Sequence, residues 1–172
     1  GLACAAMGAA RVVCTEMDRC VDLTEANVKL NARLCEEDAS SNGNWASAVE
    51  AVEYMWGQPG CPVEGCSFAI ICDALFIAVR DGIEDELLST MKQVCQSGVK
   101  LLFIYEERLG DREAAFMERA GAELRCAEVA SDQLDLDAAR NATTGEGEEA
   151  APMDMFYESP PVRLWTCEAK VA

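Results

Sequence analysis

The chain has 172 residues and a mass of 18.6 kDa, which is room for one domain, and its 51% of hydrophobic residues can build a core. Asp and Glu number 31 against 14 Lys and Arg, and the formal net charge of −17 argues against binding to nucleic-acid phosphates or to an anionic membrane surface. The sequence contains no histidine, which excludes Ser-His-Asp and Cys-His catalysis and His-ligated zinc.

The first half of the chain alternates helical and strand patterns. Asp18 is suited to begin a helix, and an apolar face recurs at helical spacing after it. The predicted elements are a helix tail at residues 1–8, a short buried strand at 11–15, a helix from Asp18 to Leu34, a polar loop at 36–44 and a half-exposed strand at 48–54.

The second half continues the alternation. Residues 68–72 form an uninterrupted apolar run, typical of a parallel strand buried on both faces. The predicted elements are a turn from Trp56 to Gly65, strands at 68–72 and 99–105, a helix from Ile83 to Gly98, a helix at 112–119 ending at Gly121, a weaker strand at 124–129 and a last strand at 162–167.

This order predicts the α/β class: an open, mostly parallel sheet with helices on both faces and a last antiparallel strand. We expect a single domain over residues 1–172, with an acidic, flexible insertion at about residues 131–160. This insertion either tunes recognition of a basic protein substrate or is a solvated tether.

The ten cysteines do not follow a disulfide pattern, because several lie within apolar runs. Cys61 and Cys66 have no second pair to complete a zinc site, so we expect no metal. No window approaches the length of an apolar transmembrane helix. A reducing environment, cytoplasmic or nuclear, fits these observations best.

Ligands of open parallel sheets bind beyond the carboxyl ends of the strands, where this sequence places Glu16, Trp56, Asp73 and Glu106. A carboxylate such as Glu16 can accept hydrogen bonds from both ribose hydroxyls of a nucleoside, or it can lie in a solvated turn. Asp73 can hold an amine, with Phe76 packing on the alkyl stem of that amine, or it can cap the helix that follows.

Five short motifs occur in order over most of residues 1–125. They are Gly1-Leu-Ala-Cys-Ala-Ala-Met-Gly-Ala, Thr15-Glu16-Met17-Asp18, Asn27-Val28-Lys29-Leu30-Asn31, Tyr54-Met55-Trp56-Gly57 and Asp73-Ala74-Leu75-Phe76. Together they resemble the seven-β-strand methyltransferases, and most closely methyltransferase family 16, which methylates lysines of non-histone proteins. The motifs correspond to the helix after the glycine-rich loop, the strand-ending acid, Asn-Val-x-x-Asn, Leu-x-Trp-Gly and Asp-x-x-Phe/Tyr of that group.

The resemblance implies S-adenosylmethionine as the cofactor and a protein lysine as the methyl acceptor. It implies that Glu16 holds the ribose, that Met17 and Trp56 flank the adenine, and that the backbone near Cys72 lies by the methionine portion. Asp73 and Phe76 would line the channel for the target lysine and serve catalysis. The chain departs from the family pattern at Ile71-Cys72 (usually Gly-Ala), at Tyr54 (usually Leu) and at Phe76 (frequently Tyr).

The family's first strand and Gly-x-Gly-x-Gly loop would precede Gly1, so we expect this chain to lack them. In the family that strand lies between the strands predicted here at residues 11–15 and 68–72. Its loss would leave one edge of each of these strands unpaired.

Two other classes of function stay open. One is a non-catalytic interaction module that keeps the architecture and binds no cofactor. The other is a dinucleotide-dependent oxidoreductase, since Glu16 also suits a nicotinamide-nucleotide ribose; Asp73, Phe76 and the Trp56-Gly57 turn argue against it. We expect a monomer whose partner is a protein carrying the target lysine, without nucleic acid or membrane.

Overall fold

The computed structural model describes residues 1–36, 43–130 and 161–170. The chain divides into two compact units, Gly1–Ser67 with Asp85–Val99 and Phe68–Glu84 with Lys100–Ala172. The expectation of a single domain stays a prediction. The acidic insertion predicted at residues 131–160 lies outside the described residues, as does most of the predicted loop at 36–44.

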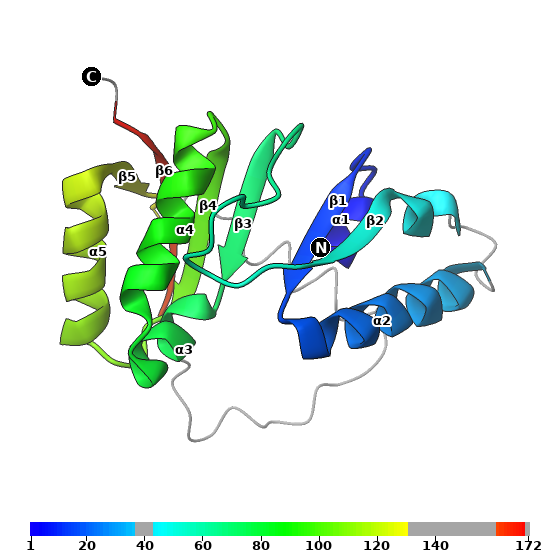
Figure 1. The fold of residues 1–172 in the computed structure, drawn as a ribbon, viewed down its shortest axis with the longest axis horizontal. Coiled ribbons are helices and arrows are strands. Elements are labelled where there is room, and N and C mark those ends of the chain that lie inside the picture. Colours follow the sequence, from blue (N-terminus) through cyan, green and yellow to red (C-terminus); the bar gives the residue numbers. More distant parts are fainter. Residues whose placement is uncertain (37–42, 131–160, 171–172) are drawn as a thin grey trace. The chain divides into compact units, whose positions relative to one another are not determined.

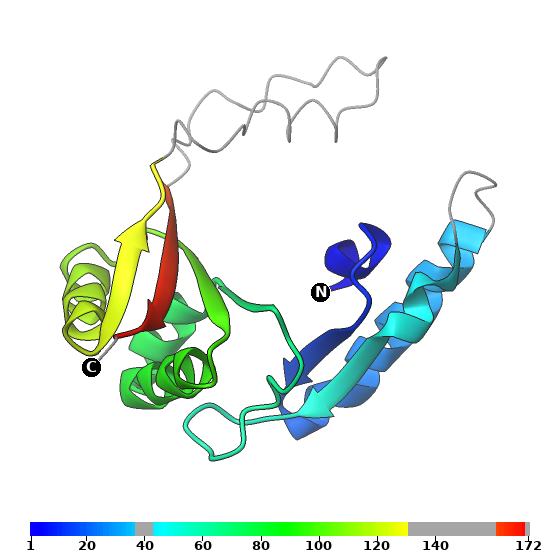
Figure 2. The ribbon, with the colours of Figure 1, turned by 90° about the horizontal axis from the view of Figure 1, so that it is seen from above.

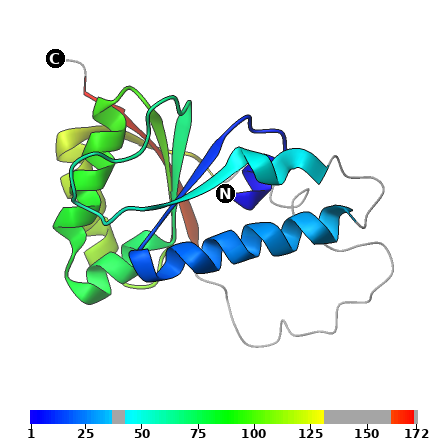
Figure 3. The ribbon, with the colours of Figure 1, turned by 45° about the vertical axis from the view of Figure 1, so that its right-hand side comes forward.

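The first unit is built around a two-stranded parallel sheet (Figure 1). The long helix α2 contacts both strands and the short η1 (Figure 3), and α1 contacts β1 and η1. Its elements are α1 (Leu2–Ala6), β1 (Val12–Glu16), α2 (Asp18–Glu36), the 3₁₀ helix η1 (Gly43–Ala48), β2 (Val49–Glu53) and most of α4 (Glu84–Gln96).

The predicted strands and helices of this unit are confirmed, with Glu16 as the last residue of its strand. The 3₁₀ helix before β2 was not predicted, because its six residues show no apolar period. Gly8 follows the first helix with φ +97°, a left-handed conformation that glycine adopts without strain.

The second unit contains a four-stranded mixed sheet in the order β3-β4-β6-β5. β3 and β4 are parallel, whereas β6 runs antiparallel to both β4 and β5 (Figure 2). The strands are β3 (Phe68–Cys72), β4 (Lys100–Glu106), β5 (Leu124–Glu128) and β6 (Val162–Ala169), and the helices are α3 (Ala74–Asp81) and α5 (Asp111–Glu123).

The core of this unit lies between the sheet and its helices. Phe103 of β4 is fully buried and its ring lies 6.0 Å from that of Phe116 in α5. Leu75 and Ala78 of α3 and Ala120 of α5 are also fully buried. Burial of these side chains stabilises the unit, by about 25 cal/mol for each Å² of apolar surface removed from water.

Two expectations for the second unit are wrong, and one of its helices was not predicted. β3 is not buried on both faces: Phe68 and Ile70 are 47% and 44% exposed, because only alternate side chains of the strand turn inward. A separate helix, α3, precedes the predicted one, since the left-handed Gly82 ends it (φ +70°). The helix predicted to end at Gly121 continues to Glu123, because the cost of a glycine within a helix, about 1 kcal/mol relative to alanine, is not enough by itself to end the helix.

The chain therefore belongs to the mixed α/β class, with two open sheets that contain parallel and antiparallel strands. Among the described residues β1 pairs with β2 alone and β3 pairs with β4 alone, so β1 and β3 each have one unpaired edge. In the described part of the chain, no helix is both long and apolar enough to cross a membrane.

Candidate functional site

Asp73 directly follows β3 and adopts a left-handed backbone conformation, φ +55° and ψ +22°. Among the described residues no other residue except glycine has a positive φ. Its N–H donates to the carbonyl of Ile104 at 2.8 Å, which extends the β3–β4 ladder by one bond. A left-handed conformation costs a residue with a Cβ atom of order 1 kcal/mol, and such residues concentrate at functional sites.

The side chain of Asp73 binds a cation instead of capping α3. Asp73 occupies the N-cap position of α3, yet its carboxylate makes no capping hydrogen bond. Its Oδ2 accepts a hydrogen bond from Nη2 of Arg108 at 3.3 Å. The alternative in which Asp73 serves as a helix cap is therefore wrong for its side chain.

Arg108 joins the two predicted catalytic residues in one cluster. Its guanidinium carbon lies 5.2 Å from the ring centroid of Phe76, within the range of a cation–π contact. Its Nε donates to Glu106 Oε2 at 2.7 Å, and its Nη2 also bonds this carboxylate. Hydrogen bonding to Glu106 raises the pKa of Arg108 above its usual value, and the charge of Asp73 raises it further.

A buried glutamate fixes the loop that carries Arg108. Glu113, on the first turn of α5, is only 1% exposed. Its carboxylate accepts the backbone N–H of Arg108 at 3.0 and 3.1 Å and that of Leu109 at 3.0 Å. This resembles half of a capping box, in which a third-position Glu reaches back to the residues before its helix. Glu113 therefore positions Arg108 from below the surface.

The sequence pattern missed Arg108, although a signal was present. Arg108 is the first cation after the run Tyr105-Glu106-Glu107, at the carboxyl end of a strand parallel to β3. Carboxyl ends of neighbouring parallel strands meet at one edge of a sheet, so this cation and Asp73 could have been paired. Glu106, named as a strand-ending acid, takes part through its contact with Arg108.

The other predicted site residues belong to the first unit, apart from Cys72. Glu16 ends β1, and its Oε1 accepts a hydrogen bond from Thr24 Oγ1 of α2 at 3.2 Å. Met17, the next residue, is 40% exposed. In the parallel register Glu53 of β2 lies opposite Glu16, so two carboxylates end neighbouring strands.

Trp56 lies in a turn that docks on α4. Gly57, with φ +81°, donates its N–H to Thr90 Oγ1 at 2.9 Å, and an added Cβ would meet Glu86 at 3.1 Å. The hydroxyl of Tyr54 donates to the carbonyl of Gln58 at 2.9 Å. Burial raises the pKa of Tyr54. Tyr54 therefore uses its hydroxyl to hold the turn, a contact that a leucine there would lack.

Cys72 is the last residue of β3 and is exposed. It pairs with Ile104 of β4, one residue before Asp73. The structure thus brings Asp73, Phe76 and Arg108 together in the second unit, with Cys72 adjacent in the chain. In the first unit Glu16 ends β1, Met17 follows it directly, and Trp56 lies in the turn after β2.

In the part of the chain that the structure describes, no group of His, Cys, Asp or Glu side chains is arranged to hold a metal ion. No protein-family model matches the chain, and no curated protein matches it.

Proposed function

We propose that the chain is a methyltransferase domain that uses S-adenosylmethionine and acts on a lysine of a non-histone protein. The observation that carries this proposal is the cation site in the second unit, where the carboxylate of Asp73 and the ring of Phe76 both contact the guanidinium of Arg108. A carboxylate beside an aromatic ring is the chemistry that recognises a protonated or developing cationic nitrogen.

The left-handed backbone at Asp73 supports a functional role. A residue with a Cβ atom persists in this conformation only where the surrounding structure enforces it. Here Asp73 N–H bonds the carbonyl of Ile104 in this conformation, and the carboxylate remains 49% exposed. The carboxylate is therefore accessible to an incoming side chain.

The strand-ending acid of the first unit supports a nucleoside site. Glu16 already accepts a hydrogen bond from one hydroxyl, that of Thr24, and a vicinal diol presents the same type of donor. Under this proposal Met17 and Trp56 would flank the adenine and the Cys72 backbone would lie by the methionine portion, as the sequence resemblance implies. The bound cofactor would supply an electrophilic methyl group on a sulfonium.

The residues of the chain would then act by alignment and electrostatics. A target amine replaces the guanidinium between Asp73 and Phe76. The Asp73 carboxylate accepts a hydrogen bond from the neutral amine and stabilises the positive charge that develops on nitrogen. Phe76 packs on the methylene stem, and such alignment can supply much of the acceleration without histidine.

A second candidate function is a non-catalytic interaction module. The observation that favours it is the same Arg108, because a cation from the chain itself already occupies the position between Asp73 and Phe76. In this case the contact is a structural ion pair, and no lysine of another protein replaces Arg108 beside Asp73 and Phe76.

Methyl transfer to the proteins of a cell lysate, followed with a tritiated methyl group, separates the two candidates. In a chain that also carries the family's first strand and glycine-rich loop, we expect transfer of label, and we expect Asp73→Asn to reduce this transfer by about 100-fold. Asp81→Asn is the matched control, since Asp81 is an exposed acid at the end of α3 that pairs with Arg80. Equal transfer by the Asp73 and Asp81 variants would contradict the role of Asp73.

Calorimetric titration with S-adenosylmethionine tests the cofactor independently. Heat of binding to the chain, lost in Glu16→Gln, supports the enzyme. No binding together with no transfer supports the interaction module.

A further inference from the structure

Two cysteines face each other across the antiparallel strands β5 and β6. Cys126 lies directly opposite Cys167, and the S–H of Cys167 donates to the sulfur of Cys126 at 2.9 Å. In the same ladder Val129 N–H donates to the carbonyl of Leu164 at 2.8 Å. Because hydrogen-bonded and non-bonded pairs alternate, the cysteine pair occupies a non-hydrogen-bonded position, where Cα atoms are closest, at about 4.5 Å.

This position suits a disulfide. Disulfides span Cα separations from about 4.4 to 6.8 Å, so the two sulfurs can be joined without moving the strands apart. Both cysteines are thiols in the structure. The pair is therefore geometrically prepared to become a cross-strand bond.

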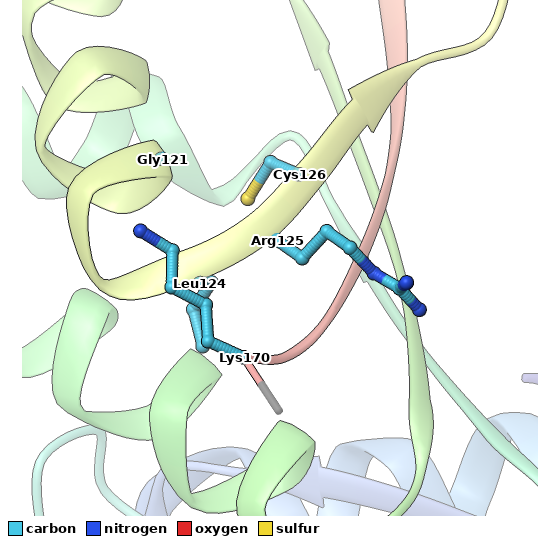
Figure 4. A pocket seen from close by; sticks show the side chains of 5 residues that line it. All are labelled: Gly121, Leu124, Arg125, Cys126 and Lys170. Carbon is cyan, nitrogen blue, oxygen red and sulfur yellow. The ribbon is translucent and has the colours of Figure 1, made fainter. Parts of the chain in front are cut away.

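The two thiols differ in access. Cys167 is fully buried, whereas Cys126 is half-buried and lines a surface hollow. Figure 4 shows the sulfur of Cys126 and the amine of Lys170 on the same side of β5, with the side chain of Arg125 on the other. The amine of Lys170 is held at the end of α5 by the carbonyl of Ala122, at 2.6 Å. A small reagent in this hollow meets Cys126 first.

The surroundings of Cys126 favour its thiolate. The hydrogen bond from Cys167 lowers the pKa of Cys126, burial acts against this, and the positive charge of Lys170 lowers the pKa further. Burial instead raises the pKa of Cys14 and of Cys61. Since the thiolate is the nucleophile, we expect Cys126 to react with an oxidant more readily than Cys14 or Cys61.

We propose that Cys126 and Cys167 form a peroxide-reactive dithiol, in which Cys126 is oxidised first and Cys167 completes a cross-strand disulfide. The Cys126 thiolate attacks one oxygen of hydrogen peroxide; the S–O bond forms, the O–O bond breaks, and the departing hydroxide takes a proton from solvent to become water. The Cys167 sulfur then attacks the resulting sulfenic acid, its proton leaves to solvent, and the sulfenic hydroxyl departs as water. The two sulfurs lose two electrons, which reduce the peroxide to two waters.

Peptide mass spectrometry of the oxidised chain tests this directly. The reduced chain is treated with hydrogen peroxide, its remaining thiols are alkylated, and it is digested with trypsin without reduction. We expect residues 126–140 linked to residues 164–170, with the link lost on reduction. Oxidation of Cys126 without this link, or a link joining other cysteines instead, overturns the proposal.

The order of reaction is tested with a sulfenic-acid trap of the dimedone type. In Cys167→Ser, which keeps a hydroxyl that can donate to Cys126 but removes the second thiol, we expect peroxide-dependent trapping at Cys126, at least about tenfold above trapping at Cys20, a partly buried cysteine of the first unit. Lys170→Met should slow disulfide formation by about threefold, since it removes a neighbouring positive charge. Trapping at Cys20 equal to that at Cys126 would show that Cys126 has no special reactivity and overturn the order. Because the first measurement uses the unaltered chain, a folding defect in a variant leaves the proposal testable.

Discussion

Two acids at the ends of parallel strands, Glu16 and Asp73, look alike in the sequence and differ in the structure. Glu16 is still part of β1 and accepts a hydrogen bond from a neutral hydroxyl, that of Thr24. Asp73 has left its strand, takes a left-handed conformation, and contacts the guanidinium of Arg108. A strand-ending acid thus acquires its chemistry from the group that it contacts: a hydroxyl of the following helix in one unit, and a cation from the loop after the neighbouring strand in the other.

The largest loss of stability is expected at Glu113, the buried residue that holds the loop carrying Arg108. Glu113→Ala leaves the backbone N–H groups of Arg108 and Leu109 without their acceptor, and we expect it to lower the free energy of unfolding by about 3 kcal/mol. Glu118→Ala, on an exposed position of the same helix, should change stability little. Chemical denaturation of both variants measures the difference. Similar losses for the two would show that the loop is held by other contacts.

The turn after β2 lies in the same unit as Glu16, and its backbone packs closely on α4 at Gly57. Gly57→Ala combines a positive φ with a close approach to Glu86, and we expect it to destabilise the chain by about 2 kcal/mol. Gly60→Ala has a similar φ of +85° in open space, so it should cost only about 1 kcal/mol. If thermal unfolding gave equal losses, close packing on α4 would not contribute.

The strain at Asp73 can be separated from its charge. Asp73→Gly and Asp73→Ala both remove the carboxylate that binds Arg108, but only alanine keeps a Cβ atom at φ +55°. We expect Asp73→Ala to be about 1 kcal/mol less stable than Asp73→Gly in urea denaturation. Equal stabilities would mean that the backbone relaxes and that no strain is stored there.

The smallest effect on stability is expected at Glu16. Glu16→Gln keeps an oxygen that can accept the hydrogen bond from Thr24, and it removes the repulsion between the carboxylates of residues 16 and 53. The free energy of unfolding should therefore change by less than about 0.5 kcal/mol. Binding of S-adenosylmethionine, by contrast, should be lost. Glu53→Gln relieves the same repulsion and should preserve binding. Loss of binding in both variants would show that the acids act jointly.

Much of the local structure follows from short-range patterns. The apolar run at 68–72, the periodic face after Asp18 and the alternation before Tyr54 each gave the right element within a residue or two. The short η1 and α3 were missed, since neither is long enough to show a full helical period beside its neighbours. Exposure of Phe68 and Ile70 was also missed, because apolar composition does not say which face of a strand is covered.

The candidate site, too, could be predicted from the sequence only in part. The sequence alone determined that acids end two strands, that Phe76 lies three residues after Asp73, and that no histidine is present for acid–base chemistry. Only the tertiary structure decided that Asp73 turns to Arg108 instead of capping α3, that Glu113 holds the intervening loop, and that Cys126 faces Cys167. The physical reason is distance along the chain. Strand and helix patterns depend on neighbouring residues, whereas these contacts join residues brought together by sheet pairing and core burial.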